Sequence, residues 1–202
     1  CLLERLPREV ETAALSLGLA LGEQHLTGRS QVGVRADIER SQGHVVEPNG
    51  LGEGELAAGA LGATPKGGVC RIALTEDDRK GRDLVASWCR EAGLDVRVDE
   101  IGNVFARRAG TDPTAPAVAT GSHIDTQPSG GKFDGNFGVL AGLEVMRTLN
   151  DLGIATRAPL EVAIWTNEEG TRFTPVMMGS GVFAGVFDAE FARRQQDRDG
   201  VS

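Results

Sequence analysis

Apolar residues recur at helical spacing from Thr75 onward. The segment "TEDDRKGRDLVASWCREAG" opens with a capping Thr75, carries acids in its first turn and reaches a stop at Gly93. Its apolar positions at helical spacing are Leu84, Val85, Trp88 and Cys89. This pattern predicts a helix over residues 75–93.

The period changes from helical to alternating after Gly93. "DVRVDE" and "NVFARRAG" alternate apolar and polar residues on either side of Ile101, Gly102 and Asn103. Two alternating runs around a glycine-containing turn are typical of a β-hairpin.

A β-α-β unit is predicted next. "PAVATGS" reads as a short apolar strand, "FGVLAGLEVMRTLNDLG" as a helix with an apolar stripe that ends at Gly153, and "PLEVAIWT" as a second buried strand. Strands joined in this way are parallel neighbours with a right-handed crossover. The chain is therefore expected to be of the α/β class. Residues 1–60 are Gly-rich and offer only a possible helix around "REVETAALSLGLAL".

Composition narrows the class of protein. The 202 residues are 40% hydrophobic, which is enough to bury the core of one large domain or of part of a bigger protein. A net charge of -8, without a cluster of Lys and Arg, argues against nucleic acid as a partner. No apolar run approaches the roughly 18 residues of a membrane helix, so no membrane partner is expected.

Cysteine usage and the ends of the chain suggest two further expectations. Cys1, Cys70 and Cys89 form neither a paired framework nor a CxxC motif, which favours a reducing, cytoplasmic location. The chain opens at Cys1 instead of Met and closes on the turn-like "DRDGVS". We therefore expect a fragment of a longer protein.

Acidic residues follow both strands of the β-α-β unit. "GSHIDTQPSGGKFDG" supplies His123, Asp125 and Asp134, and "NEEG" supplies Glu168 and Glu169. Ligand sites of α/β sheets lie outside the carboxyl ends of the strands, so the two loops are expected to converge. Four carboxylates without a counter-charge would raise one another's pKa. One or two divalent metal ions would remove that cost.

The residue types suit zinc, manganese or cobalt better than calcium or magnesium, because an imidazole accompanies the carboxylates. On extended backbone, His123 and Asp125 project to one side, so the Asp125 carboxylate is expected to accept the second ring N–H of His123. Asp134 lies between glycines that let backbone approach a metal, and its carboxylate could bridge two ions. Of Glu168 and Glu169, one would ligate and the other would be the general base.

Each motif also has a simpler interpretation. A His-x-Asp pair is commonly a surface hydrogen bond, two adjacent glutamates are commonly a solvated face, and "PSGGKFDGNFG" could be a plain loop or a phosphate cradle without a P-loop ending. The occurrence of both acidic clusters after strands joined by one helix favours the metal site.

"GSHIDTQPSGGKFDGNFGVLAGLEV" and "NEEGTRFTPVMMGS" together resemble the dinuclear metal amidohydrolases of the M20 peptidase superfamily. Within it they resemble the hydantoinase/carbamoylase branch of N-carbamoyl-L-amino-acid hydrolases, β-ureidopropionases and allantoate amidohydrolases. With the upstream "GATPKGGVCRIALTEDDRKGRDLVASWC" and "DEIGNVFARRAG", the resemblance covers residues 60–202. It implies the N-terminal part of a catalytic domain with a mostly parallel sheet flanked by helices.

The resemblance also implies roles. His123 would ligate one metal, Asp134 would bridge both and Glu169 would ligate the other, while Asp125 orients His123 and Glu168 is the general base. Two divalent ions (Zn²⁺, Mn²⁺ or Co²⁺) would assist hydrolysis of the ureido group of an N-carbamoyl-L-amino acid or of 3-ureidopropionate to amino acid, CO2 and ammonia. Allantoate is the alternative substrate.

The family pattern further includes two later histidines and a dimerisation domain, which implies a homodimer for the full-length protein. No histidine follows His123 here, and His25 and His44 lie in the poorly matched residues 1–59. We therefore expect that the dimerisation domain and the C-terminal catalytic part are absent. A truncated, non-catalytic paralogue is the other interpretation.

Overall fold

The computed structural model describes residue 54 and residues 57–202. In chain order its elements are α4 (Glu76–Glu91), β1 (Asp95–Val98), β2 (Val104–Arg108), β3 (Val118–His123), α5 (Asn136–Asp151), β4 (Leu160–Trp165), α6 (Met178–Phe183) and α7 (Ala189–Arg193). The possible helix in "REVETAALSLGLAL", and also His25 and His44, lie outside the described residues.

The first predicted helix is confirmed as α4. The Thr75 hydroxyl accepts a hydrogen bond from the main-chain N–H of Asp78 at 3.4 Å, and three acids occupy the first turn, where the helix dipole favours negative charge. Gly93, just beyond the helix, has a φ of +78°, a conformation that costs glycine little. The face of α4 with Val85, Ala86 and Cys89 is buried.

The predicted hairpin is also confirmed. β1 and β2 pair antiparallel from Asp95↔Arg107 to Val98↔Val104. The turn between them is closed by the N–H of Gly102, which donates to the Asp99 carbonyl at 3.1 Å.

The β-α-β unit forms as predicted. β3 and β4 pair parallel, from Val118↔Leu160 to His123↔Trp165. The connecting helix α5 packs over both strands and buries Val139, Leu143 and Met146. The two strands therefore end at the same edge of the sheet.

The α/β class is confirmed, but the parallel share of the sheet is smaller than expected. The strand order is β1-β2-β4-β3, and only the β3–β4 pairing is parallel, since β2 runs antiparallel to β4. The reason is that the β1–β2 hairpin supplies half of the strands described. β4 lies between two neighbours and is buried along five of its six residues, whereas β3 lies at an edge and is partly exposed.

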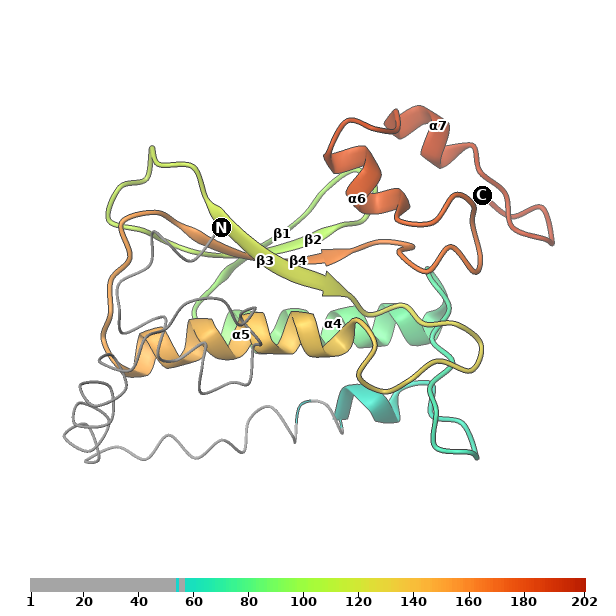
Figure 1. Cartoon of the computed structure of the whole chain (residues 1–202), viewed down its shortest axis with the longest axis horizontal. Helices are drawn as coiled ribbons and strands as arrows, with labels where there is room; N and C mark the ends of the chain where they lie inside the picture. Colours follow the sequence, from blue (N-terminus) through green and yellow to red (C-terminus); the bar gives the residue numbers. More distant parts are fainter. Residues whose placement is uncertain (1–53, 55–56) are drawn as a thin grey trace, which may run out of the picture. The chain divides into compact units, whose positions relative to one another are not determined.

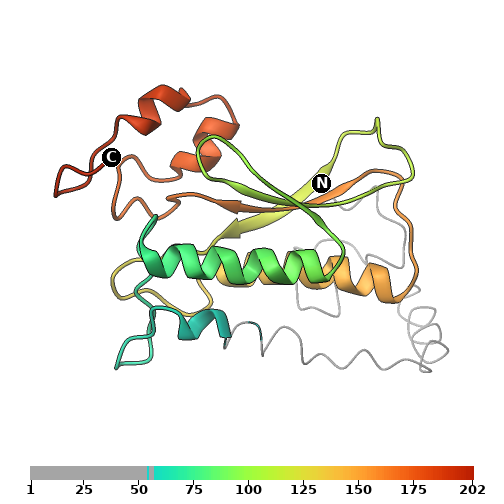
Figure 2. The same ribbon diagram turned by 180° about the vertical axis from the view of Figure 1, so that it is seen from behind.

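Helices lie on both faces of the sheet. In Figures 1 and 2, which show opposite sides, α4 and α5 lie below the same face of the sheet, and α6 and α7 lie above its other face near the carboxyl end of β4. Phe183 of α6 contacts Phe105 and Trp165 on that upper face, with ring centroids 5.4 and 5.3 Å apart. None of the helices in the described part of the chain combines the length and the apolar character that a membrane crossing requires.

The cap of α4 provides a test of the local structure. We expect Thr75→Ala to lower the free energy of unfolding by about 1 kcal/mol, because the Asp78 N–H loses its acceptor. Thr75→Ser keeps the hydroxyl and should stay close to the wild type. Urea unfolding followed by circular dichroism measures both, and equal stability of the Ala and Ser variants would contradict the capping role.

Candidate metal centre

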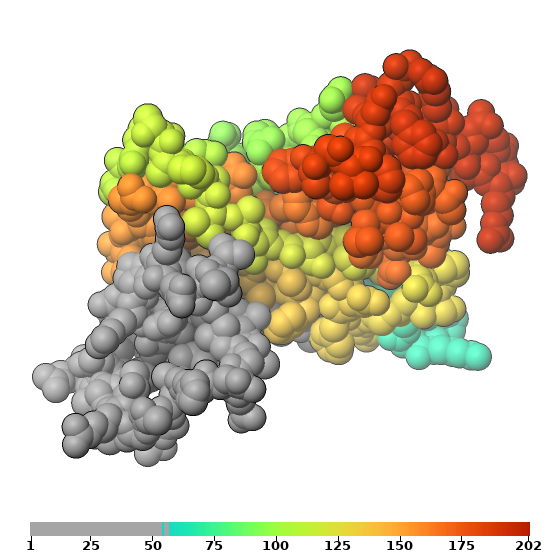
Figure 3. All heavy atoms as spheres, turned by 45° about the horizontal axis from the view of Figure 1, so that its top comes forward, coloured from blue at the N-terminus to red at the C-terminus, as the bar shows by residue number. Residues whose placement is uncertain are grey.

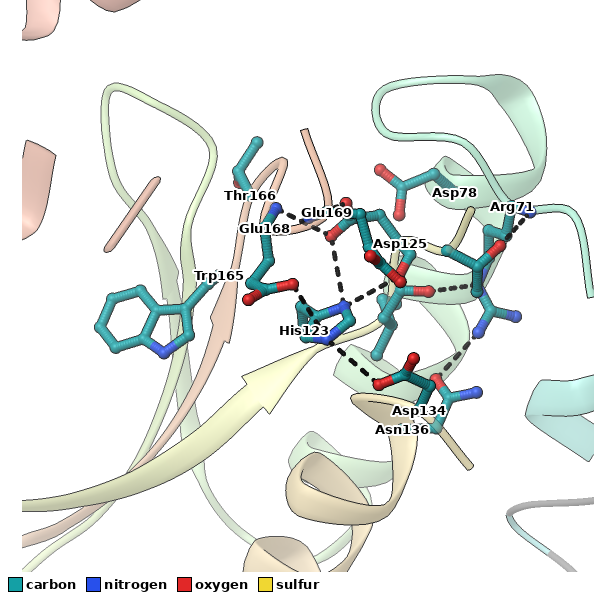
Figure 4. A network of polar contacts seen from close by, with 12 residues as sticks. Arg71, Asp78, His123, Asp125, Asp134, Asn136, Trp165, Thr166, Glu168 and Glu169 are labelled. Carbon is teal, nitrogen blue, oxygen red and sulfur yellow. Dashed lines mark hydrogen bonds and ion pairs between the residues drawn. The ribbon is translucent and has the colours of Figure 1, made fainter. Parts of the chain in front are cut away.

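The two acidic loops meet where β3 and β4 end. His123 is the last residue of β3, and its Nε2 lies 3.3 Å from Oε2 of Glu168 and 3.9 Å from Oδ1 of Asp134. Figure 4 shows these side chains converging on the imidazole. In Figure 3 the yellow atoms of the β3–α5 connection lie directly against the orange and red atoms that follow β4. The structure thus brings together groups that are far apart in sequence.

Three of these side chains can share an ion. One ligand atom each from His123, Asp134 and Glu169 lie within 4.8 Å of one another. Glu169 uses one carboxylate oxygen to accept from Gln127 Nε2 at 3.1 Å, and its other oxygen, Oε1, is buried without a hydrogen-bond partner among the described residues. A buried, unpartnered carboxylate oxygen is costly unless a cation approaches it. The donor set of one imidazole and two carboxylates therefore fits a divalent transition metal.

The imidazole of His123 is oriented by main chain. Its Nδ1 lies 2.8 Å from the carbonyl oxygen of Asp125. Because a carbonyl oxygen only accepts, Nδ1 donates this hydrogen bond, and Nε2 faces the carboxylates. The prediction that the Asp125 carboxylate accepts this N–H is wrong: its Oδ1 lies 3.7 Å from Nδ1. The chain turns directly after β3, so the carbonyl oxygen occupies the place expected for the side chain.

The Asp125 carboxylate instead holds the second loop. It is fully buried and accepts from the main-chain N–H groups of Glu168 at 3.3 Å and Glu169 at 3.2 Å. Burial raises the pKa of the Asp125 carboxyl, while His123 and the two amide donors oppose that rise. One aspartate therefore contacts the ring of the first loop through its main chain and the backbone of the second loop through its side chain.

This geometry can be compared with known proteins. The profile of peptidase family M20/M25/M40 matches residues 119–199, which include all five side chains of the centre. A solved structure of a hydantoinase/carbamoylase family amidase from Burkholderia ambifaria is 58% identical, with a TM-score of 0.75, over 75% of this chain and 37% of that one. This chain belongs to the M20 family, in its hydantoinase/carbamoylase branch.

Curated relatives are amidohydrolases by name. An N-carbamoyl-L-amino-acid amidohydrolase from Rhizobium meliloti is 56% identical over 142 residues, which is 70% of this chain and 34% of the relative. An allantoate amidohydrolase from Bacillus subtilis is 39% identical over 141 residues, again 70% of this chain and 34% of the relative. The chain thus spans 34% of the length of each of these two curated relatives.

Asn167 shapes the second loop of this M20 centre and was not singled out from the sequence. It adopts a left-handed φ of +52°, and its side chain donates to the Phe173 carbonyl at 2.8 Å and accepts from the Phe173 N–H at 3.3 Å. These bonds close a loop around Glu168 and Glu169. Asparagine tolerates a positive φ better than most residues, so its place directly before the acidic pair is the signal that could have identified it.

Gly135 lets the Asp134 segment approach the ring. Its φ is +70°, and a Cβ atom there would lie 2.5 Å from the His123 carbonyl oxygen and 2.6 Å from His123 Nε2. The sequence pattern was interpreted as room for a metal next to backbone, whereas the close neighbour in the structure is the imidazole itself. Any larger residue would push the His123 ring or the Asp134 loop away.

This contact yields a prediction for metal binding. Gly135→Ala should weaken Zn²⁺ binding roughly tenfold or more, because it displaces the candidate ligand His123 or Asp134. Gly131→Ala in the same loop is the matched control, since its Cβ would meet only the Asp134 Cβ at 3.9 Å. Competition with a chromophoric chelator measures both, and equal affinities for the two variants would contradict the close-approach role of Gly135.

Proposed function

We propose that this chain forms the metal-binding part of an amidohydrolase that removes the N-carbamoyl group from N-carbamoyl-L-amino acids or 3-ureidopropionate. The observation that carries the proposal is the grouping of His123, Asp134 and Glu169 around one point, with the Glu168 carboxylate 3.3 Å from the same imidazole. The curated relative from Rhizobium meliloti, an N-carbamoyl-L-amino-acid amidohydrolase, supports the substrate class. The products would be the amino acid, CO2 and ammonia.

Two divalent ions are the proposed cofactors. His123 would hold one ion through Nε2, Glu169 the other, and Asp134 would contact both, with Zn²⁺, Mn²⁺ and Co²⁺ all suited to these donors. When bound, such ions polarise a carbonyl group and lower the pKa of water. The exposed side chain of Asp134, at 61%, leaves this part of the centre open to a small ureido substrate.

Glu168 is the proposed general base. Its side chain is 31% exposed, so water and substrate can reach it, and the Asp125 carboxylate fixes its main chain. Glu168 would take a proton from the water that adds to the ureido carbonyl carbon, and would deliver that proton to the amino-acid nitrogen as its C–N bond breaks. The carbamate released then decomposes to CO2 and ammonia.

Allantoate is the second candidate substrate, favoured by the curated relative from Bacillus subtilis. It also carries ureido groups, so the same base and ligands would serve. Parallel assays with N-carbamoyl-L-amino acids, 3-ureidopropionate and allantoate distinguish the candidates by kcat/KM.

Three expectations from the sequence stay predictions: the division of the chain at residue 60, the cytoplasmic location, and a homodimer of the full-length protein.

The division of roles between the two glutamates can be tested on the native protein that carries this sequence. Glu168→Gln should lower kcat by roughly 10²–10⁴-fold, because the base is lost, while metal content measured by atomic emission stays at the wild-type level. Glu169→Gln is the companion variant and should lose metal. Wild-type turnover in Glu168→Gln would remove Glu168 as the base, and loss of metal from it would show that the two roles are exchanged.

A further inference from the structure

An arginine with no exposed surface lies behind the metal centre. Arg71 is 0% exposed, and its guanidinium donates four hydrogen bonds. Nε donates to the Ile124 carbonyl at 2.7 Å, one terminal nitrogen donates to the Ala58 and Leu61 carbonyls at 2.6 and 3.0 Å, and the other donates to Asn136 Oδ1 at 2.8 Å. Burying a guanidinium costs free energy unless its N–H groups are hydrogen-bonded. This nearly complete set of acceptors therefore stabilises Arg71 in its buried position.

Two of these acceptors are adjacent to metal ligands. Ile124 directly follows His123, and Asn136 lies two residues after Asp134. The amide of Asn136 also donates to the Lys132 carbonyl at 2.8 Å. Through Asn136, Arg71 is therefore hydrogen-bonded to the chain after Asp134 and linked to the chain before it. Figure 4 shows the guanidinium on the side of Asp134 and Asn136 away from β4.

The surrounding backbone is arranged around this side chain. Gly81 lies inside α4, and a Cβ atom there would come within 3.0 Å of Arg71 Cδ and 3.4 Å of its Nε. Glycine inside a helix is destabilising relative to alanine, and here it leaves the space that Arg71 occupies. The main chain of Arg71 is also fixed, because its N–H donates to the Thr126 hydroxyl and its carbonyl accepts from the Thr126 N–H, both at 2.8 Å.

Two buried carboxylates oppose part of the cost of burying this cation. Burial lowers the pKa of the Arg71 guanidinium, and the negative charges of Asp78 and Asp125, both fully buried, oppose that lowering. Lysine would keep the charge, but its single nitrogen cannot donate to Ile124, to Asn136 and to the carbonyls of residues 58 and 61 at once.

We propose that Arg71 is a positioning residue for the metal centre, which sets the separation of His123 and Asp134 by bonding to Ile124 and Asn136. This inference rests on the proposed function, because it assigns Arg71 a role toward the ligands named there. Arg71 touches neither the ions nor the substrate and acts through the two ligand loops.

The test compares three variants of the chain. Arg71→Lys removes the planar set of donors, and Asn136→Ala removes one acceptor and leaves Arg71 in place. Arg108→Lys is the matched control, because Arg108 likewise bonds an asparagine oxygen and a carbonyl, Asn150 Oδ1 at 2.7 Å and Ile154 O at 2.6 Å. Arg108 pairs with the first residue of β4, at the end of the sheet remote from the centre.

Two readouts separate positioning from general stability. One is Co²⁺ affinity together with the ligand-field absorption of the bound ion, and the other is the ¹⁵N chemical shift of the His123 ring without metal, assigned with a His123→Asn variant. Arg71→Lys and Asn136→Ala should each weaken Co²⁺ binding roughly tenfold or more, alter its absorption and shift the ring ¹⁵N signals. Arg108→Lys should change none of these.

The outcomes are distinguishable. Unchanged affinity and ring signals in both Arg71→Lys and Asn136→Ala would overturn the proposal, as would equal changes in Arg108→Lys. If Arg71→Lys does not fold, Asn136→Ala decides by the same criteria. A wild-type chain that binds no Co²⁺ would count against the proposed metal function, and the ring ¹⁵N signals would still decide the positioning role.

Discussion

The main-chain hydrogen bonds between β3 and β4 bring two acidic loops to one edge of the sheet. Their parallel register ends with His123 opposite Trp165, and a slip of one residue would turn the imidazole to the other face. Glu168 and Glu169 follow within four residues of this pair, so backbone pairing also places them. Asp134 depends instead on the start of α5, where Gly135 brings the chain against the His123 ring.

The carboxylates gathered at this edge repel one another, and the cations among the described residues offset that repulsion only in part. Arg172, a cation close in sequence, pairs with Asp197 at 2.9 Å and donates to the carbonyls of residues 73 and 74. Arg71 lies on the inner side and offsets the buried Asp78 and Asp125. The side of His123 that faces Asp134, Glu168 and Glu169 keeps its excess of negative charge, which suits a site that attracts divalent cations.

Local signals in the sequence predicted the elements well. Thr75 and Gly93 mark the two ends of α4, and alternating apolar and polar residues on either side of Gly102 form the β1–β2 hairpin. Both could be predicted because caps, turns and periodicity depend on only a few neighbouring residues. The antiparallel addition of β2 to β4 was not predicted, since no local pattern specifies which strand a hairpin joins. The same limit explains the site. Its candidate ligands could be listed from motifs, but the main-chain partners of the Asp125 carboxylate and the Ile124 and Asn136 partners of Arg71 are tertiary contacts more than 40 residues away.

The span of the Arg71–Asn136 hydrogen bond has a consequence for the order of folding. It joins residues that are 65 positions apart in the sequence. The hydrogen bond between Gln127 and Glu169 joins two residues that are 42 positions apart. Helix α4 and the β1–β2 hairpin can form from local contacts, whereas the metal centre requires these long loops to close first. Ion binding would therefore stabilise the assembled β3–α5–β4 unit as a whole and would report completed folding more faithfully than helix content does.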